Sequence, residues 1–358
     1  MGYRKFLIYL LSTSLIIAGL YSFFIYQTDP LGYYGVKEKS QYYHSNGRYQ
    51  LPAFIKNLEY DTIIIGPSMS QNFDEQLFDK ELKVKSFNAS LSAASAKEQN
   101  YVYQLAAQTH KDLKNVYWEI NFDSLYGESN RVNEDSGAFP TYLYNSFALD
   151  DVRYLFSYYA GESFVETLKA ARNNAPFQTP YEIYKFGKDI PPLTVDQYKD
   201  TRASENNNPI PEGVSFQNMK DNFDKNILPM LKEHPEHQFK LYYTPYPITY
   251  HIFNFNRSQQ AFIDRLKIKE YIFAQVQDLE HVEVYDFQAE SNVTFTISNY
   301  LDGSHYFADI NDWMTTQFAE GNYLQTAETT QENYIKLLAQ VENFSAKQLA
   351  EQKNEEPV

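Results

Sequence analysis

Short apolar runs separated by polar, helix-forming stretches set the pattern of this chain from about residue 57 onward. The clearest run spans residues 61–65, where the last four residues are all β-branched, as in a strand covered on both faces. Gly66 and Pro67 then end the strand sharply. Comparable runs predict four further strands, at residues 83–87, 116–120, 239–244 and 282–286.

Helical patterns fill the intervals between the predicted strands, at residues 75–82, 95–108, 216–232, 258–277 and 329–343. Strands that alternate with helices favour an α/β fold with a mostly parallel sheet. The carboxyl ends of parallel strands meet at one edge, where open α/β sheets bind their ligands. Residues that directly follow the strands are therefore the candidate functional residues.

Residues 127–215 break this rhythm. They are rich in Tyr, Phe, Asn and Pro, with helical patches near 151–158 and 163–172 and a loop at 206–211. We interpret the region as an insertion or lid over the active edge of a domain that spans residues 59–344. Residues 345–358 are predicted to form a polar, frayed tail.

The N-terminus differs in kind, because residues 6–26 carry no charge and a helix needs about 20 apolar residues to cross a bilayer. Arg4 and Lys5 precede this stretch, so residues 1–5 are predicted to stay in the cytoplasm. The connection at 27–58 and the domain after it would then lie outside. A cleaved signal peptide is the alternative, but its apolar region is usually about 7–15 residues long and ends in an A-x-A-like site, which this stretch lacks. The pattern favours an uncleaved single-pass anchor in the lipid bilayer.

Composition narrows the classes of protein to which the chain can belong. Of its 358 residues, 43% are hydrophobic and none is cysteine, which excludes disulfides and thiolate catalysis. The formal net charge of −15 argues against a nucleic-acid partner, since a phosphate backbone repels an acidic surface. A candidate nucleophile must be sought among other side chains.

Ser68 directly follows the first predicted strand, which places it at the active edge of the sheet. A serine hydroxyl is protonated at neutral pH, so it needs a base within hydrogen-bond reach and an acceptor that orients the base. Asp302 and His305, three residues apart after the last strand, can supply both from one turn. Base assistance of this kind accelerates a reaction by roughly 10²–10⁴-fold.

Other patterns have simpler explanations. Gly-Pro-Ser commonly forms a plain turn and Asp-x-x-His is common in loops, so the inference needs both features at one sheet edge. His234 and His237 lie in a proline-containing loop without the helical spacing of a zinc site, and no metal is predicted. Nothing sets a separation between Glu119 and Asp123 that would indicate a glycosidase. The 32 tyrosines suit either a sugar-stacking surface or ordinary packing at the edge of the core.

Four short blocks of the chain resemble those of SGNH (GDSL-type) hydrolases: Gly66-Pro67-Ser68, a small-residue turn at 88–95, Asn121, and Asp302-x-x-His305. The resemblance extends to a bacterial, membrane-anchored branch of that superfamily. Its G-T-S-M-x-x-N-F segment is matched by residues 66–73, its aromatic-proline turn by 243–247 and its Y-x-D-x-x-H-Y ending by 300–306. Residues 139–144 fit the insertion of that branch. The similarity covers most of residues 27–343, in short distinctive stretches.

The resemblance implies a three-layer, flavodoxin-like sheet and roles for five residues. Ser68 would be the nucleophile, His305 its base and Asp302 the partner of the base. The N–H groups of Ser68 and Ala93 and the side chain of Asn121 would stabilise the oxyanion of a tetrahedral intermediate.

The resemblance also implies a serine esterase or O-acyltransferase that faces the periplasm or the cell exterior of a bacterium and needs no cofactor. An acyl ester and a cell-surface or exported polysaccharide are the expected substrates, and a membrane-bound O-acyltransferase is the candidate protein partner. Three positions depart from the family pattern: Pro67 replaces the Asp of G-D-S, Ala93 replaces a glycine, and Glu119 stands where glycine is usual. They favour an alternative, a catalytically inactive SGNH-fold factor that binds or assembles a polysaccharide acylation system.

Overall fold

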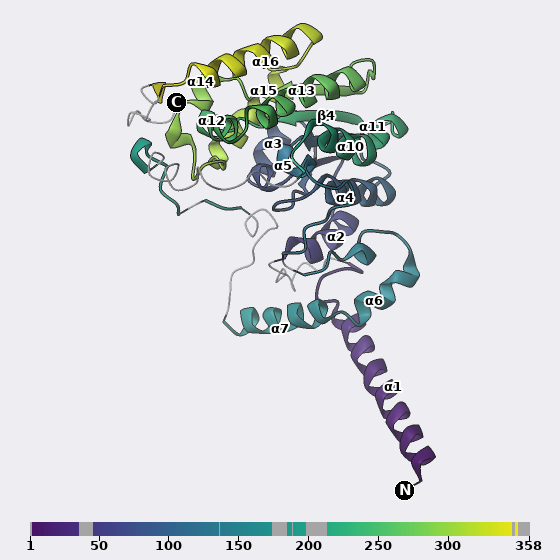
Figure 1. Ribbon diagram of the computed structural model, residues 1–358. Helices are drawn as coiled ribbons and strands as arrows, with labels where there is room; N and C mark the ends of the chain where they lie inside the picture. Colours follow the sequence, from purple (N-terminus) through teal and green to yellow (C-terminus); the bar gives the residue numbers. More distant parts are fainter. Residues whose placement is uncertain are drawn as a thin grey trace. The chain divides into compact units, whose positions relative to one another are not determined.

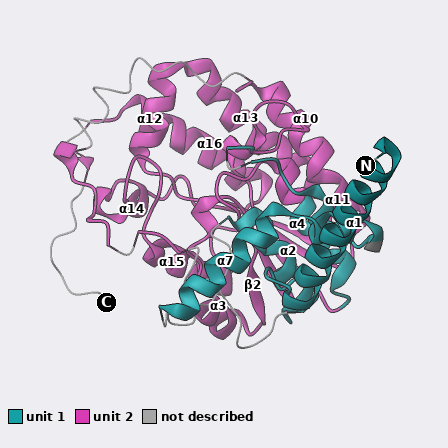
Figure 2. Cartoon of the chain, turned by 90° about the horizontal axis from the view of Figure 1, so that it is seen from below, with its two compact units in different colours: residues 1–59, 101–111, 134–183 teal, residues 60–100, 112–133, 184–358 magenta. Residues whose placement is uncertain are grey.

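The computed structural model describes residues 2–35, 46–135, 137–173, 185–187, 189–197, 213–345 and 348–349. The chain divides into two compact units (Figure 2). The first unit comprises residues 1–59, 101–111 and 134–183, and the second comprises residues 60–100, 112–133 and 184–358. The predicted loop at 206–211 lies outside the described residues, as do most of the predicted tail and parts of the predicted insertion.

The second unit is built on five parallel strands in the order β2-β1-β3-β4-β5. They are β1 (Thr62–Ile65), β2 (Ser86–Asn88), β3 (Asn115–Glu119), β4 (Gln238–Tyr243) and β5 (Val282–Asp286). The predicted α/β class with a parallel sheet is thus confirmed. This strand order is that of flavodoxin-like sheets, which bind ligands where the order reverses, at the carboxyl ends of β1 and β3. Ser68 and Asn121 follow those two strands.

Four of the five strands lie within one residue of their predicted limits, and β2 is the exception. The apolar run predicts its start at residue 83, but Lys83 adopts a left-handed φ of +57° and caps the preceding helix α3 (Glu75–Leu82). The helix predicted over 216–232 is also wrong in one respect, because it is two helices, α10 (Phe216–Asn226) and α11 (Leu228–Glu233). Pro229, in the first turn of α11, cannot donate a hydrogen bond to continue α10.

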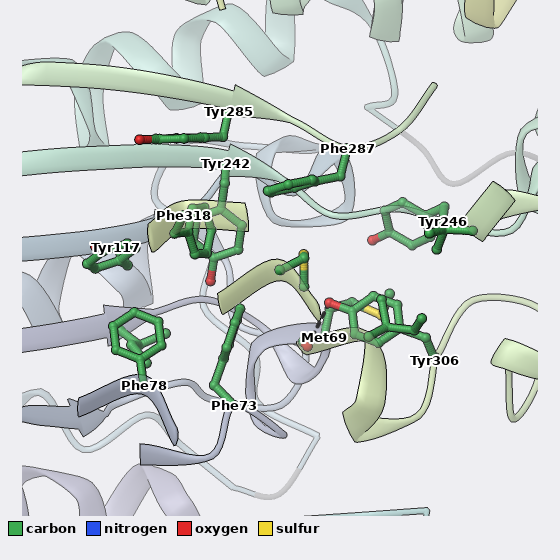
Figure 3. Close-up of a cluster of buried hydrophobic side chains, with 14 of the residues drawn as sticks. Met69, Phe73, Phe78, Tyr117, Tyr242, Tyr246, Tyr285, Phe287, Tyr306 and Phe318 are labelled. Atoms are coloured by element: carbon green, nitrogen blue, oxygen red, sulfur yellow. Dashed lines mark hydrogen bonds between the residues drawn. The ribbon is translucent and has the colours of Figure 1, made fainter. Parts of the chain in front are cut away.

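Helices cover both faces of the sheet (Figure 1). On one face, α3 and α15 (Ala308–Glu320) pack onto side chains of the strands through an aromatic core (Figure 3). For example, the rings of Phe78 and Tyr117 lie 4.7 Å apart. On the other face, Trp118 donates a 2.7 Å hydrogen bond to Gln99 of α4 (Ala96–Thr109), and Lys269 of α13 (Gln259–Val276) lies over the ring of Tyr243. The domain core is therefore a sheet between two helical layers.

The remaining helices of the second unit are short or peripheral. They are the 3₁₀ turns η1 (Ser68–Ser70) and η4 (Ile297–Asn299), and the α-helices α5 (Phe122–Leu125), α12 (Ile248–Arg257), α14 (Ser291–Thr294) and α16 (Ala327–Glu342). Of these, η1 and α5 matter most for the site, because they begin directly after β1 and β3.

The first unit is helical in its described part. It contains α1 (Tyr3–Thr28), α2 (Gly47–Asn57), η2 (Thr141–Leu143), η3 (Ala148–Asp150), α6 (Asp151–Leu155) and α7 (Tyr158–Arg172). Helix α1 includes the predicted stretch 6–26 and is long and apolar enough to cross a membrane. Helix α2 lies inside the predicted connection 27–58 and was not predicted, because Gly47 and Pro52 interrupt its helical pattern.

Candidate active site

Ser68 opens the 3₁₀ turn η1 at the carboxyl end of β1, with its side chain half-buried. Pro67, in an extended conformation, separates it from Gly66 and ends the strand. The hydroxyl oxygen Oγ of Ser68 lies 2.9 Å from Nε2 of His305. The predicted nucleophile and its predicted base, 237 positions apart in the chain, are therefore within hydrogen-bond distance.

His305 and Asp302 belong to one turn, which is held in shape by hydrogen bonds between its own residues. Asp302 Oδ2 lies 2.8 Å from His305 Nδ1, while Oδ1 accepts the backbone N–H groups of Ser304 and His305, both at 2.8 Å. About half of the Asp302 side chain is exposed. Burial of the rest opposes ionisation, but the hydrogen bonds and the charge of His305 outweigh it and hold the pKa of Asp302 below its usual range. An ionised Asp302 fixes the orientation of the imidazole ring.

Buried tyrosines set the distance between this turn and Ser68. The Tyr306 hydroxyl donates to the carbonyl of Met69 at 3.0 Å, so the neighbours of His305 and Ser68 are joined directly. Tyr300 pairs with Tyr306 across the base of the turn and donates to the carbonyl of Pro245 at 2.9 Å. Both tyrosines are almost fully buried, and so the register of the two loops is fixed by the core and not by the site alone.

Phe186 covers the imidazole of His305 from one side. Their ring centroids lie 5.2 Å apart at an edge-to-face angle of 83°. Asn72 holds Phe186 in place through two hydrogen bonds to its backbone, at 3.0 Å from the N–H and 3.2 Å to the carbonyl. Asn72 belongs to the motif at 66–73, so this motif positions both the serine and a cover for its base.

The two remaining predicted oxyanion donors, Ala93 and Asn121, differ in exposure and in hydrogen bonding. Ala93 is exposed after β2, and its φ of +51° lies in the region that favours glycine. Its N–H, like that of Ser68, donates no hydrogen bond to any residue that the structure describes. Asn121 is buried, and its amide nitrogen donates to Oε1 of Glu119 at 3.0 Å and to the Tyr246 hydroxyl. Both amide N–H groups of Asn121 are thereby engaged.

Glu119 is the buried centre of a polar network beneath the serine turn. Its carboxylate accepts hydrogen bonds from Ser70 and from Thr244 at 3.2 Å, besides the one from Asn121. Burial raises the pKa of Glu119 to about 7, although the three hydrogen bonds and the nearby His305 act in the opposite direction. Gly66 makes room for the network, since a Cβ there would lie 2.9 Å from Ser70 Cβ and 3.0 Å from Glu119 Cβ.

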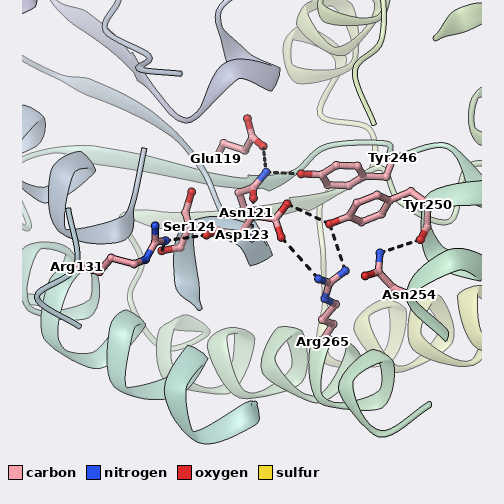
Figure 4. Close-up of polar contacts among 9 residues, drawn as sticks. All are labelled: Glu119, Asn121, Asp123, Ser124, Arg131, Tyr246, Tyr250, Asn254 and Arg265. Atoms are coloured by element: carbon pink, nitrogen blue, oxygen red, sulfur yellow. Dashed lines mark hydrogen bonds and ion pairs between the residues drawn. The ribbon is translucent and has the colours of Figure 1, made fainter. Parts of the chain in front are cut away.

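A second polar group lies beside Asn121, on α5, α12 and α13 (Figure 4). The exposed carboxylate of Asp123 accepts a 3.2 Å hydrogen bond from the Tyr250 hydroxyl and lies 3.6 Å from the guanidinium of Arg265. Arg265 is buried and also donates to Tyr250 at 3.2 Å. The ring of Tyr250 stacks on that of Tyr246 at 4.2 Å, and Tyr246 bonds Asn121. We call Asp123, Tyr246, Tyr250 and Arg265 the rim.

His234, Glu236 and His237 form a cluster whose ligand-type atoms all lie within 4.8 Å of one another. His234 Nδ1 is 2.8 Å from Glu236 Oε1, and the two imidazole rings stack. The cluster precedes β4, at the end of the sheet opposite Ser68. It is therefore separate from the candidate active site, and no metal role follows for the chemistry of Ser68.

The structure brings Ser68, His305 and Asp302 together and places Ala93 and Asn121 after the neighbouring strands, with Asn121 turned toward Glu119 and Tyr246. The sequence reasoning missed the roles of Ser70, Phe186 and Glu119. The apolar strand ending in Glu119 was a signal for the last of these, because a charged residue in a buried strand needs partners. The chain matches no protein-family profile and no characterised protein sequence.

Proposed function

We propose that this chain is a serine esterase or O-acyltransferase of the SGNH type, held at the outer face of a bacterial membrane by α1. The observation that supports the proposal most is the hydrogen-bond chain from Ser68 through His305 to Asp302, with distances of 2.9 Å and 2.8 Å. Nucleophile, base and orienting carboxylate in this sequence are the arrangement that activates a serine.

In the proposed reaction, Ser68 Oγ attacks the carbonyl carbon of an ester while His305 Nε2 takes its proton. The N–H groups of Ser68 and Ala93, which donate to none of the described residues, donate to the oxyanion that forms, and Asp302 stabilises the imidazolium. His305 then returns the proton to the leaving alcohol as the ester bond breaks, which leaves an acyl group on Ser68. Water or an acceptor hydroxyl, deprotonated by His305, attacks the carbonyl carbon of the acyl-serine. His305 then returns this proton to Ser68 Oγ as the bond between Oγ and the acyl group breaks, which releases the acid or the new ester.

Asn121 takes part in this scheme only after a rearrangement. One of its N–H groups must leave Glu119 or Tyr246 before it can donate to an oxyanion. Substrate binding can drive the exchange, since a full negative charge is a stronger acceptor than a tyrosine hydroxyl.

A polysaccharide hydroxyl is the proposed acyl acceptor. The rim supports this class through the exposed carboxylate of Asp123 and the partly buried ring of Tyr250, which the buried Arg265 and Tyr246 hold in place. An aromatic ring beside a fixed polar group suits the alternating apolar and hydroxyl surface of a sugar. A membrane-bound O-acyltransferase is the proposed supplier of the acyl group.

The test uses the full-length protein in detergent with p-nitrophenyl acetate as the acyl donor. We expect a burst of p-nitrophenol equal to the enzyme concentration, followed by turnover that an oligosaccharide acceptor accelerates. Ser68→Ala should abolish both phases. A wild-type rate that persists in Ser68→Ala would contradict the proposal.

The alternative is an inactive SGNH-fold factor that binds polysaccharide or an acyltransferase. The engaged state of both Asn121 N–H groups is the observation that favours it. Under this alternative the folded protein shows no burst of p-nitrophenol. Substitutions in the rim weaken oligosaccharide binding, and they weaken it equally in the wild-type chain and in Ser68→Ala.

A further inference from the structure

Exposed apolar side chains of the first unit gather on one short segment. Outside α1, eleven large apolar residues of the described chain are exposed, and seven of them fall between Phe147 and Leu168, on or directly beside η3, α6 and α7. Among them, Tyr158 is 73% exposed and Leu168 is 53% exposed. A concentration of this kind on one segment indicates a contact surface and not the ordinary scatter of single exposed residues.

This segment is joined rigidly to the end of α1, where α7 begins and runs crosswise to it (Figure 1). The Tyr154 hydroxyl donates a 2.6 Å hydrogen bond to Asp29, the residue that caps α1. Ser163 of α7 donates to the carbonyl of Pro30 at 3.1 Å. All of these residues belong to the first unit, so the joint does not depend on the second.

Two residues inside the uncharged stretch of α1 contact α7 directly. The Tyr21 hydroxyl donates to the carbonyl of Ser157 at 2.8 Å, and a Cβ on Gly161 would lie 2.9 Å from that hydroxyl. The rings of Phe24 and Phe164 meet edge to face at 4.6 Å. Helix α7 is thus packed against the last turns of α1 as well as against the residues that follow it.

The length of α1 then gives the depth of α7. The 21 uncharged residues from Phe6 to Tyr26 span about 31 Å as a helix, close to the roughly 30 Å hydrocarbon core of a bilayer. Tyr21 lies five residues before the end of this stretch, or about 8 Å. Helices that lie in a membrane interface are buried by about 5–10 Å, so α7 has the depth of an interfacial helix.

The composition of α7 agrees with this depth. Tyr158, Val165 and Leu168 are exposed along one side of the helix, and Lys169 and Arg172 stand in its last turn, where their stems can reach from apolar surroundings to headgroups. A hollow of about 470 Å³ lies where Tyr21 of α1 meets α7, which lines it with Tyr158, Gly161, Glu162, Val165, Glu166 and Lys169. Its lining is both apolar and charged, as expected at the boundary between acyl chains and headgroups.

We infer that α6 and α7 form a membrane-seated platform: their exposed apolar side chains lie in the outer leaflet, at the boundary between headgroups and acyl chains. This inference rests on the part of the proposed function that places α1 across the membrane. It adds a second contact with the bilayer, which fixes the tilt of the first unit where a single helix would leave it free to swing.

The test attaches an environment-sensitive NBD fluorophore to single cysteines in the full-length chain, which has no cysteine of its own. The variants are Leu168→Cys and Val165→Cys on α7, Ile16→Cys in the middle of α1, and Ile335→Cys on α16. Ile335 is 58% exposed and controls for exposed aliphatic character alone. The labelled proteins are placed in vesicles of phosphatidylcholine and phosphatidylglycerol that carry a nitroxide either near the headgroup or at the end of the acyl chain.

We expect both α7 probes to lose more fluorescence to the nitroxide near the headgroup, the Ile16 probe to lose more to the chain-end nitroxide, and the Ile335 probe to lose none. Quenching at Ile16 without quenching on α7 would overturn the platform and leave the anchor intact. Absence of quenching at Ile16 would overturn the anchor and the platform with it. Equal quenching on α7 and at Ile335 would also overturn the platform, because any exposed aliphatic position would then collect lipid. None of these outcomes depends on the activity of Ser68.

Discussion

Two carboxyl groups at the candidate active site lie in opposite environments. Asp302 is half exposed on a turn, and its hydrogen bonds with His305 and Ser304 lower its pKa despite partial burial. Glu119 is fully buried beneath the serine turn, and burial raises its pKa to about 7 despite three hydrogen bonds. Each carboxyl group is tied to a different serine, Asp302 to Ser68 through His305, and Glu119 to Ser70 directly.

The difference separates a chemical from a structural task. Asp302, an ionised carboxylate that orients His305, suits a catalytic role beside Ser68. Glu119, a buried acid, accepts hydrogen bonds from residues of η1 and of the loops after β3 and β4, and so holds this edge of the sheet together. The two serines lie only two residues apart, so their roles are set by their surroundings. Variants that disturb one side and spare the other test this division.

The largest effect is expected on the exposed side. His305→Ala should lower the rate of p-nitrophenyl acetate hydrolysis by roughly 10²–10⁴-fold, because Ser68 loses its base. Asp302→Asn should cost less, since Ser68 and His305 both remain. Steady-state kinetics of full-length variants measure both losses. Ser304→Ala is the control, because it removes a hydroxyl that lies 3.2 Å from Asp302 Oδ1 and 3.4 Å from His305 Nδ1 while Ser68, His305 and Asp302 all remain. If Asp302→Asn lowered the hydrolysis rate more than His305→Ala does, the assignment of His305 as the base and Asp302 as its orienting partner would be wrong.

On the buried side, Glu119 should control the pH dependence of stability. The pKa of Glu119 in the folded chain exceeds its ordinary value of 4.5, so the group contributes stability below pH 4.5 that is lost as the pH rises through about 7. Glu119→Gln should remove this loss, which amounts to roughly 3 kcal/mol in the free energy of unfolding. Urea denaturation at several pH values measures it.

For Asp302, the free energy of unfolding should change with pH in the opposite direction, and Asp302→Asn tests this by the same measurement. Because the pKa of Asp302 is lowered from its ordinary value of 3.8, the contribution of this group is present above pH 3.8 and is lost as the pH falls further. Asp302→Asn should therefore flatten the stability curve only at its acid end. If both variants flattened the same pH range, the contrast between the two carboxyl groups would be wrong.

Gly66→Ala should disturb the buried side by steric contact. The new Cβ would press on Ser70 and Glu119, and overpacking of this kind costs about 1–3 kcal/mol in the free energy of unfolding. Gly35→Ala is the matched control, since a Cβ at that position meets no heavy atom of the described residues within 4 Å. Thermal or urea denaturation compares the two. Equal stability of both variants would show that η1 can move away from β3.

The smallest effect is expected at Ala93. Its left-handed φ of +51° costs a residue with a Cβ about 1–2 kcal/mol, and Ala93→Gly should recover part of it, for a net gain of under about 1 kcal/mol in the free energy of unfolding. Ala94→Gly, at the buried neighbouring position, should be destabilising instead. A loss of stability in both variants would contradict the strained conformation of Ala93.

The sequence predicted those helices and strands in which every residue favours the same secondary structure. The β-branched run of β1 and helix α3, with its Asp74 cap, lie where expected. Helix α15 escaped prediction because Asn311 and Thr315 are buried among its apolar residues and blur its periodicity. Helix α2 escaped because of its glycine and proline.

The residues of the candidate site likewise fall into those that local sequence patterns predict and those that they do not. Ser68 was predictable because it follows β1 at the edge where parallel strands end. Asp302 and His305 were predictable because their three-residue spacing lets one turn present both an orienting carboxylate and a base. The network of Glu119 was not, since it depends on the register that sets Glu119 beside Tyr242 and on the turn that brings the Ser70 hydroxyl to the carboxylate. Phe186 is reached only through Asn72, a contact across 114 residues of chain that no local pattern encodes.

Covalent labelling is the direct test of whether Ser68 is an activated nucleophile. Full-length protein in detergent is treated with a fluorophosphonate, digested, and mapped by mass spectrometry. We expect one adduct, on Ser68, that disappears in Ser68→Ala and persists in Ser304→Ala. No adduct on the folded protein, or an adduct that survives Ser68→Ala, would contradict it.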